Sequence, residues 1–348
     1  MPRVMKSMVV LSAAALALSA CGGGDTEAAG PTGTTSPTKA DAALKVGMAF
    51  DTGGRGDGTF NDLAVAGLEK AKAEFSAQTQ ELSPKEDGSD RADLLRQLAD
   101  DGFNPVIGVG FSYADDMDTV AKEYPDVTFI RVDGRPGAAE NVAVASFAEH
   151  EGSYLVGAAA ALKSKTNHIG FIGGNEGVLI SKFYAGFVQG AKAVNPSIKV
   201  DDKRLAAGES PDGFGAIPGA KVAAQAMYQD GADIVYTAAG GSWGGSFPAA
   251  VDAGKLAIGV DSDQYETVPP AFQKVILTSM VKRVDSAVFE SVQTFKDTGK
   301  AESKAYALAD DGVGYSTSGG MVDDIKTQLE DYRTKIIDGS IKVAETAP

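Results

Sequence analysis

The sequence predicts an α/β protein with two lobes, each built on a parallel β-sheet that helices cover on both faces. Short β-rich runs alternate with amphipathic helical segments along most of the chain, which is typical of parallel sheets. The alternation restarts at residue 168, after a helical segment of small residues at 152–163. Two series of this size favour two lobes, because one continuous sheet with that many strands would be unusually wide.

Each expected strand is a short β-rich run that leads through a polar or glycine turn into an amphipathic helix. The first series has expected strands at 44–50, 79–82, 106–109, 128–132 and 142–146, and expected helices at 61–75, 91–101, 114–124 and 152–163. The second has expected strands at 168–172, 198–205, 234–237, 256–260 and 275–280, and expected helices at 182–194, 220–230, 247–253, 284–298 and 321–338. Ligands of open α/β sheets bind outside the carboxyl ends of the strands, so the loops that follow the strands are the candidate sites.

The start of the chain reads as an export and anchoring segment. Lys6 precedes an apolar run at 8–20 that is too short to span a bilayer. The motif LSAC, which ends at Cys21, then matches a lipobox, the sequence at which bacterial lipoproteins are cleaved and lipidated. We therefore expect a signal peptide at 1–20 and a lipidated Cys21 that anchors the protein to the outer face of the cell membrane. The alternative is an ordinary secretory signal followed by a free thiol.

The segment after the lipobox has too little apolar content to pack. It is rich in Gly, Thr, Pro and Ala, so we expect a flexible tether over 21–43 and a globular body over 44–348. The formal net charge of −15 disfavours nucleic acid as a partner, because an acidic surface repels phosphates.

Counts of reactive residues exclude several kinds of catalysis. Cys21 is the only cysteine, so its lipidation would leave no thiol nucleophile, disulfide or cysteine metal site. The two histidines, His150 and His168, lie near no G-x-S-x-G motif, and HExxH is absent. We expect no metal and no cofactor, although acidic residues are too common to exclude catalysis by paired carboxylates.

The loop after the first strand, DTGGRGDGTFND at 51–62, combines glycines with one apolar ring. Thr59 and Asp62 fit a capping box that would start the next helix. Phe60 could then stack on a flat ligand while the Asn61 amide binds the edge of a heterocycle. The alternative is that Phe60 serves as a hydrophobic staple.

Later loops offer further candidates. Phe111 and Tyr113 could line a cleft or pack in the core, and Phe214, which stands alone among glycines, could stack on a ligand or plug the lobe. The segment AAGGSWGGSF at 238–247 allows a ligand to approach backbone N–H groups but is neither a P-loop nor G-x-G-x-x-G. Its Trp243, the only tryptophan, could be a lid residue or a packing residue.

Two charged residues follow neighbouring strands of the second series. Asp261 could accept two hydrogen bonds from a vicinal diol such as that of ribose. Lys282 could hold such a carboxylate ionised and also donate to a hydroxyl. The alternative is a surface ion pair, which contributes little to stability.

At these loops the chain resembles the basic membrane protein family, lipid-anchored substrate-binding proteins of ABC transporters that include purine nucleoside receptors. The matching segments span nearly the whole body in the expected order: DTGGRGDGTFND, VGFSYADDM, YPDVTFIRVD, IGFIGG with FYAGFVQGAK, QAMYQDGADIVYTAAGG, AIGVDSDQ and ILTSMVKRVDSAVFE. The combination of TFND, GVDSDQ and LTSMVKR is specific.

The resemblance implies a type I periplasmic-binding-protein fold, with two Rossmann-like lobes joined by a three-segment hinge that closes on ligand. We accordingly expect one lobe over 44–147 plus 276–308 and the other over 148–275 plus 309–348.

The resemblance also implies the roles of eight residues. It places a purine base between Phe60 and Phe214, with Asn61 on the base edge. The family positions that line the pocket and hold the ribose correspond here to Asp51, Gly240, Gly241, Asp261 and Lys282.

We therefore predict a monomeric, lipid-anchored receptor that captures a nucleoside without chemical change and delivers it to an ABC permease and its ATPase. Two other classes stay open. One is a nucleoside hydrolase, against which the absence of a tight aspartate cluster counts. The other is a receptor that uses the same pocket for sensing.

Overall fold

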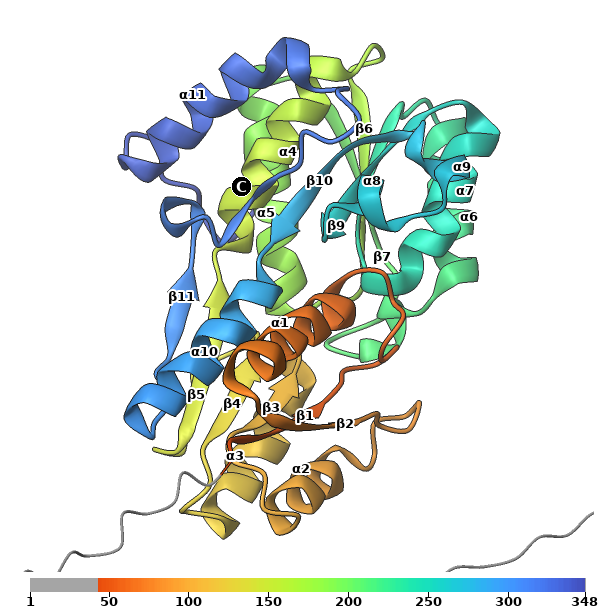
Figure 1. Ribbon diagram of the computed structural model, residues 1–348. Coiled ribbons are helices and arrows are strands. Elements are labelled where there is room, and N and C mark those ends of the chain that lie inside the picture. Colours follow the sequence, from red (N-terminus) through yellow and green to blue (C-terminus); the bar gives the residue numbers. More distant parts are fainter. Residues whose placement is uncertain (1–42, 348) are drawn as a thin grey trace, which may run out of the picture. The chain divides into compact units, whose positions relative to one another are not determined.

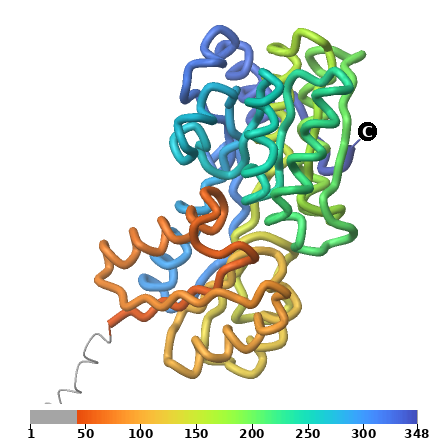
Figure 2. Tube along the Cα trace, turned by 90° about the vertical axis from the view of Figure 1, so that its right-hand side faces the viewer, coloured from red at the N-terminus to blue at the C-terminus, as the bar shows by residue number. Residues whose placement is uncertain are grey.

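The computed structural model describes residues 43–347 (Figure 1). The expected signal peptide, the lipidation of Cys21 and the tether before residue 43 therefore lie outside the described residues. The described chain folds into two α/β lobes, each with one β-sheet, and Figure 2 shows the two lobes from the side. None of the helices between residues 43 and 347 is long and apolar enough to cross a bilayer.

The first lobe has a sheet in the order β11-β5-β4-β3-β1-β2, with every neighbouring pair parallel. Its strands are β1 (Lys45–Ala49), β2 (Gln78–Leu82), β3 (Val106–Val109), β4 (Phe129–Val132), β5 (Val142–Phe147) and β11 (Lys304–Tyr306). The central strands β3 and β4 are buried throughout, which explains their mostly apolar sequences, although β4 also buries Arg131. The edge strand β2 is polar and half-exposed.

The second lobe repeats this arrangement in the order β12-β10-β9-β8-β6-β7. Its strands are β6 (His168–Gly173), β7 (Lys199–Arg204), β8 (Ile234–Ala238), β9 (Leu256–Asp261), β10 (Ile276–Lys282) and β12 (Val313–Tyr315). All pairs are parallel except β10 with β12, which is antiparallel. The two expected series are confirmed, whereas β11 and β12 were not predicted, because three residues carry too little periodicity.

Helices cover both faces of each sheet. In the first lobe α1 packs on α10, and α2 packs on α3 (Figure 1). These helices are α1 (Phe60–Phe75), α2 (Arg91–Asp100), α3 (Ala114–Glu123) and α10 (Val284–Thr298). In the second lobe α4 packs on α5, and α6 packs on α7. The helices of that lobe are α4 (Glu149–Lys163), α5 (Val178–Val194), α6 (Ile217–Gln229), α7 (Trp243–Ala253), α8 (Gln264–Thr267), α9 (Pro270–Gln273) and α11 (Lys326–Ile337).

The small residues of α4 and α5 allow these helices to approach closely. A Cβ atom added at Gly190 of α5 would lie 1.9 Å from the Tyr154 carbonyl oxygen, and one added at Gly186 would lie 2.0 Å from that of His150. Both distances are far inside van der Waals contact, so glycine is required at these positions. This close packing against α5 explains why α4, which is rich in alanine and glycine, is stable.

Three segments cross between the lobes. They are Ala148 between β5 and α4, Arg283 between β10 and α10, and the stretch 307–312 between β11 and β12. The expected boundary at residue 276 is wrong, because β10 is hydrogen-bonded to β9 and β12 in the second sheet, and the chain crosses only after it. β10 thus belongs to the parallel part of the second sheet, and the chain re-enters the first lobe with α10.

Candidate ligand-binding site

A cavity of about 370 Å³ lies where loops from both lobes meet. Its wall includes residues that follow or end β1, β3 and β4 of the first lobe and β8 and β9 of the second. In both lobes the first strand of the series lies between the second and the third, so the strand order reverses at this point. Ligands of doubly wound sheets bind at such switch points, at the carboxyl ends of the strands.

All eight residues singled out from the sequence line this one cavity: Asp51, Phe60, Asn61, Phe214, Gly240, Gly241, Asp261 and Lys282. Phe111 and Trp243, for which the sequence left a cleft or lid role open beside packing, also line it. The other lining residues were not singled out, namely Thr52, Gly53, Gly56, Asp57, Asp133, Leu179, Ile180, Phe183, Gly215, Ile217, Ala238, Gly244 and Val260. The lining is thus mostly apolar with a few buried charges, as is typical of small-molecule sites. That these residues bind ligand stays a prediction.

The loop before α1 is organised differently from the expected capping box. Thr59 occupies the N-cap position but makes no side-chain capping bond, so the prediction for Thr59 and Asp62 is wrong. Asp57 takes the role instead, since its carboxylate accepts hydrogen bonds from the backbone N–H groups of Thr59, Asn61 and Asp62. Asp62 accepts from Gly56 and Gly58. Carboxylates at a helix N-terminus are stabilised in this way.

Asn61 lines the cavity, but its amide is bound within the same loop. The Oδ1 atom accepts a hydrogen bond of 3.1 Å from the Asp51 N–H, and Nδ2 donates to Asp57 Oδ2 at 3.1 Å and to the Thr52 carbonyl at 3.4 Å. Contact with a base edge would use the second lone pair of Oδ1 or exchange one of these bonds.

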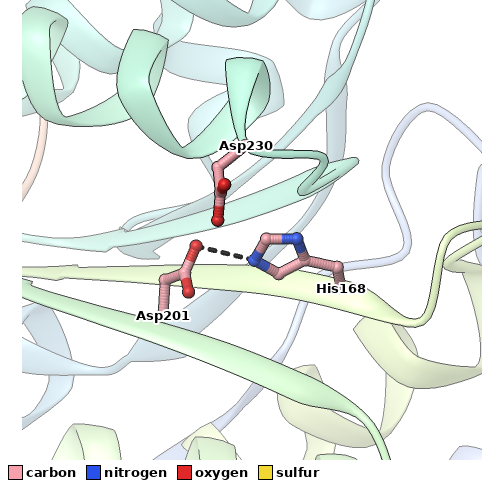
Figure 3. Close-up of side chains that lie close together, drawn as sticks. All are labelled: His168, Asp201 and Asp230. Carbon is pink, nitrogen blue, oxygen red and sulfur yellow. Dashed lines mark hydrogen bonds and ion pairs between the residues drawn. The ribbon is translucent and has the colours of Figure 1, made fainter.

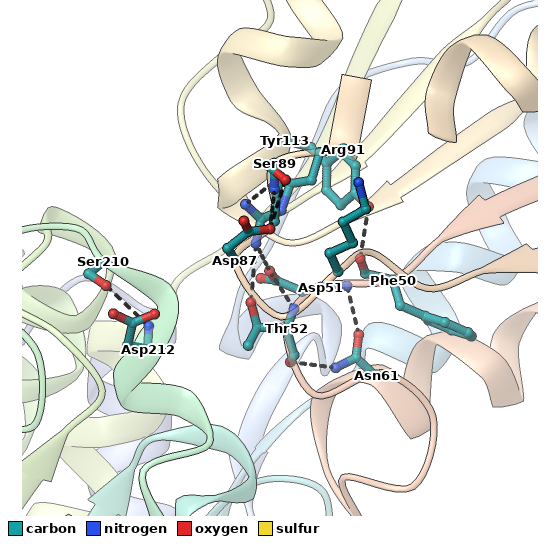
Figure 4. A network of polar contacts seen from close by, with 12 residues as sticks. Phe50, Asp51, Thr52, Asn61, Asp87, Ser89, Arg91, Tyr113, Ser210 and Asp212 are labelled. Atoms are coloured by element: carbon teal, nitrogen blue, oxygen red, sulfur yellow. Dashed lines mark hydrogen bonds and ion pairs between the residues drawn. The ribbon is translucent and has the colours of Figure 1, made fainter. Parts of the chain in front are cut away.

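Asp51 belongs to a buried polar network (Figure 4). Its carboxylate accepts from the Thr52 N–H at 2.8 Å and lies 3.5 Å from the guanidinium of Arg91. Nearby, the Tyr113 hydroxyl donates to the Phe50 carbonyl, which places Tyr113 in the core rather than in a cleft. Burial raises the pKa of Asp51 to about 6, although Thr52 and Arg91 act in the opposite direction.

Lys282 is the centre of a buried charge cluster and not part of a surface ion pair. Its Nζ lies 2.6 Å from Asp133 and 3.3 Å from Glu149, and the side chain is 1% exposed. Burial alone would lower the pKa of Lys282, but Asp133, Glu149 and Asp261 raise it above its ordinary value. Aromatic rings surround the ammonium, with the ring centres of Phe60, Phe147 and Phe183 at 5.1, 4.8 and 5.6 Å.

The positive charge of Lys282 does not balance all the carboxylates of this cluster. Burial raises the pKa of Asp261 to about 7 despite the opposing charge of Lys282, so the lysine does not hold it fully ionised as expected. Burial also raises the pKa of Glu149. Within the described chain, Oδ1 of Asp261 and Oδ1 of Asp133 are buried without a hydrogen-bond partner. The wall of the cavity therefore carries two buried carboxylate oxygens that could accept hydrogen bonds from a ligand.

The aromatic and glycine residues shape the rest of the wall. Phe60 comes from the first lobe and Phe214 from the second, and the ring centre of Phe214 lies 5.9 Å from that of Phe111. Gly240 has a φ of +49°, and a Cβ added there would lie 3.3 Å from the Phe214 carbonyl oxygen. Glycine at this position thus lets the loop after β8 approach the loop that carries Phe214.

Asp133 and Glu149 are the main site residues that the sequence analysis did not identify. Asp133 directly follows β4, so a search for carboxylates at strand ends could have found it. Glu149 begins α4 at a crossing segment and carried no such indication.

A second polar cluster lies outside the cavity, at the amino end of β6 (Figure 3). His168 Nε2 lies 2.6 Å from Asp201, and the carboxylate of Asp230 is close to both. The ammonium of Lys199 pairs with both aspartates, so a cation of the chain itself already offsets part of their charge. The arrangement is a salt-bridge cluster at the end of the sheet opposite to the cavity.

Sequence comparison identifies the family to which this fold and cavity belong. The family model of PnrA-like ABC transporter substrate-binding proteins (Bmp) matches residues 44–347. The chain belongs to the Bmp family. It is thus a solute-binding protein of an ABC transporter, and the family is one of binding proteins rather than enzymes. A permease and a captured solute are the partners that follow from this membership.

Curated relatives of this Bmp protein cover it almost completely. It is 34% identical to the ABC transporter nucleoside-binding protein BmpA of Lactococcus lactis, over 97% of this chain and 99% of the relative. It is 32% identical to the CD4+ T-cell-stimulating antigen of Listeria innocua, over 97% of each chain. An uncharacterized lipoprotein of Pyrococcus furiosus is 32% identical over 80% of this chain and 71% of its own.

Solved structures confirm the fold of the Bmp protein. A solute-binding protein of an ABC transporter system from Aeropyrum pernix matches with a TM-score of 0.73 and 24% identity, over 86% of this chain and 92% of that one. The myo-inositol-binding protein of Caulobacter matches with a TM-score of 0.58 and 16% identity, over 83% and 98%. The expected periplasmic-binding-protein fold is therefore confirmed.

Proposed function

We propose that this Bmp protein binds a nucleoside, with a purine as its base, and delivers it unchanged to the permease. The observation that carries the proposal is the pair of buried oxygens without a partner in the described chain, Asp133 Oδ1 and Asp261 Oδ1, beside the Lys282 ammonium in a mostly apolar cavity. A vicinal diol supplies two O–H donors to such carboxylates and accepts from the lysine. The description of the Lactococcus relative as nucleoside-binding supports this class of ligand.

Selectivity for the sugar follows from the cost of leaving these acceptors unpaired. A ligand without the diol would leave Asp133 and Asp261 without donors in a buried site, which costs about 1–3 kcal/mol for each group. Ionised carboxylates form the stronger hydrogen bonds, so the cost rises once Asp261 is deprotonated.

Affinity for the base would come mainly from the aromatic wall. Phe60 and Phe214 reach the cavity from opposite lobes, so lobe closure could bring a flat ring between them. Such aromatic contacts contribute about 0.5–1.5 kcal/mol each beyond the burial of apolar area. Asn61 would contact the base edge through its remaining acceptor capacity.

We further propose that Cys21 carries the lipid anchor and that the monomeric receptor works on the outer face of the membrane. The lipobox motif that ends at Cys21 supports the anchor, and relatives described as lipoproteins support the localisation. The body would then be confined near the permease that receives its ligand.

Calorimetry with inosine, guanosine, adenosine and cytidine tests the proposal, with 2′,3′-dideoxyinosine and hypoxanthine as controls. We expect purine nucleosides to bind and the two controls to bind at least about tenfold more weakly. Binding of free ribose or of hypoxanthine as tightly as inosine would contradict the proposal. Chromatography of the same samples should show no free base, since release of base would indicate a hydrolase.

A further inference from the structure

Three side chains of the second lobe donate hydrogen bonds to two successive backbone carbonyls of the first lobe. Trp243 Nε1 donates to the Asp57 carbonyl at 3.0 Å. Ser262 Oγ and Thr267 Oγ1 both donate to the Gly58 carbonyl, at 2.9 and 3.2 Å. The donors come from the start of α7, the turn after β9 and the end of α8. These bonds therefore cross the cleft between the lobes.

The acceptor loop is held in place by its own lobe. The Asp57 carboxylate accepts from the N–H groups of Thr59 and Asn61, each at 2.9 Å, and that of Asp62 accepts from the Gly58 N–H at 2.9 Å. Gly58 has a φ of +69°, which other residues rarely adopt. The loop that carries the two carbonyls is thus held by bonds within the first lobe.

The three donor side chains are also held in place by contacts within the second lobe. The indole of Trp243 packs against the rings of Phe247 and Phe272, with centres 5.5 and 6.3 Å apart. Ser262 is buried, and its hydroxyl lies 3.5 Å from that of Thr267. Trp243 also lines the ligand cavity, so the same ring forms part of the wall and part of the cross-lobe contact.

We propose that Trp243, Ser262 and Thr267 form a latch that holds the lobes closed and slows the escape of ligand. When the lobes separate, the two carbonyls and three donors bind water, so each bond contributes only modestly to closure. Their combined effect falls on the dissociation rate, because these bonds must break before a bound ligand can leave. Trp243, Ser262 and Thr267 are positioning residues that act through the loop at 56–58.

The kinetic test compares the full chain with Trp243→Phe, which keeps an aromatic ring and removes the N–H donor, and with the double variant Ser262→Ala/Thr267→Val. Thr119→Val is the matched control, because its hydroxyl donates to the Asp115 carbonyl within α3. With inosine as the probe, we expect the double variant to dissociate about tenfold faster, with association changed by less than about twofold. Equal dissociation rates in the double variant and Thr119→Val would overturn the latch.

The choice of inosine rests on the proposed function, so a second measurement uses no ligand. Trp243 is the only tryptophan of the chain, so the fluorescence reports on the surroundings of this one side chain. We expect acrylamide to quench it more strongly in Ser262→Ala/Thr267→Val than in Thr119→Val, at equal melting temperatures. Equal quenching would overturn the latch, whereas failure of inosine to bind, with the quenching difference present, would contradict only the nucleoside proposal.

Discussion

Asp133 and Asp261 occupy equivalent positions in the two lobes. Asp133 directly follows β4 and Asp261 ends β9, which are the fourth strands of their series. Both have left-handed backbones, with φ values of +72° and +62°, and both are buried. Left-handed non-glycine residues are uncommon, and strained backbones of this kind cluster at functional sites. The two lobes thus present matching carboxylates to one cavity, and Lys282 binds the first at 2.6 Å.

Replacement of Asp261 by asparagine should weaken nucleoside binding about tenfold or more. Asparagine has the same shape and tolerates a left-handed backbone, so the fold is retained. It removes the negative charge that strengthens hydrogen bonds from ligand hydroxyls. Calorimetry with inosine measures the effect, and Asp263→Asn, two residues further along the chain, is the control. Equal affinities of the two variants would rule out a ligand role for Asp261.

The same variant should be more stable than the unmodified protein at neutral pH. The pKa of Asp261 is raised from 3.8 to about 7 by burial, so the folded state holds a proton that the unfolded chain releases. Stability from this group is therefore complete below about pH 4 and is lost as the pH rises to 7. The loss amounts to about 4 kcal/mol at most.

Denaturant unfolding of both proteins between pH 4 and 8 measures this difference. The advantage of Asp261→Asn should grow with pH up to about 7 and then level off. A constant difference across the range would show that Asp261 titrates normally. A residue that lowers stability but serves binding is expected at a functional site.

The sequence predicted the general position of the cavity because carboxyl ends of parallel strands meet at one edge of a sheet. Asp51, Asp261 and Lys282 each lie at such an end, so strand prediction brought them together. Asp133 also lies at such an end, but its pairing with Lys282 was not predictable in this way. The bond between them joins residues 149 positions apart, and that pairing depends on how the two lobes meet. The role of Asp57 was missed because several acidic residues of the loop could have capped α1.

Loss of the Lys282 ammonium should destabilise the protein strongly. Lys282→Met keeps most of the side-chain volume but leaves Asp133 and Glu149 without their counter-ion in a buried site. Breaking a buried ion pair in this way costs about 3–5 kcal/mol. Lys199→Met is the control, because Lys199 is 55% exposed and its pairs contribute about 0–1 kcal/mol. Similar unfolding midpoints for the two variants would contradict the buried cluster.

Gly190→Ala should also destabilise the protein, although alanine normally favours a helix by about 1 kcal/mol. The added Cβ would lie 1.9 Å from the Tyr154 carbonyl oxygen, so α5 would have to move away from α4. Overpacking of this kind costs about 1–3 kcal/mol. Gly215→Ala is the control, since a Cβ there meets nothing within 4 Å. Denaturant unfolding should show a lower midpoint for Gly190→Ala only.

Variants of Phe60 distinguish the two roles that the sequence left open for this residue, which are stacking on a flat ligand and serving as a hydrophobic staple. If it stacks on the base, Phe60→Ala should weaken inosine binding about tenfold or more, and Phe60→Leu should have an intermediate effect because it keeps apolar area without the ring. If it serves only as a hydrophobic staple for α1, the melting temperature should fall and the affinity should not. Its ring lies 5.1 Å from the Lys282 ammonium and on the cavity wall, which favours the first outcome. Calorimetry and thermal unfolding of the same two variants separate the interpretations, since only stacking on the base predicts a loss of affinity.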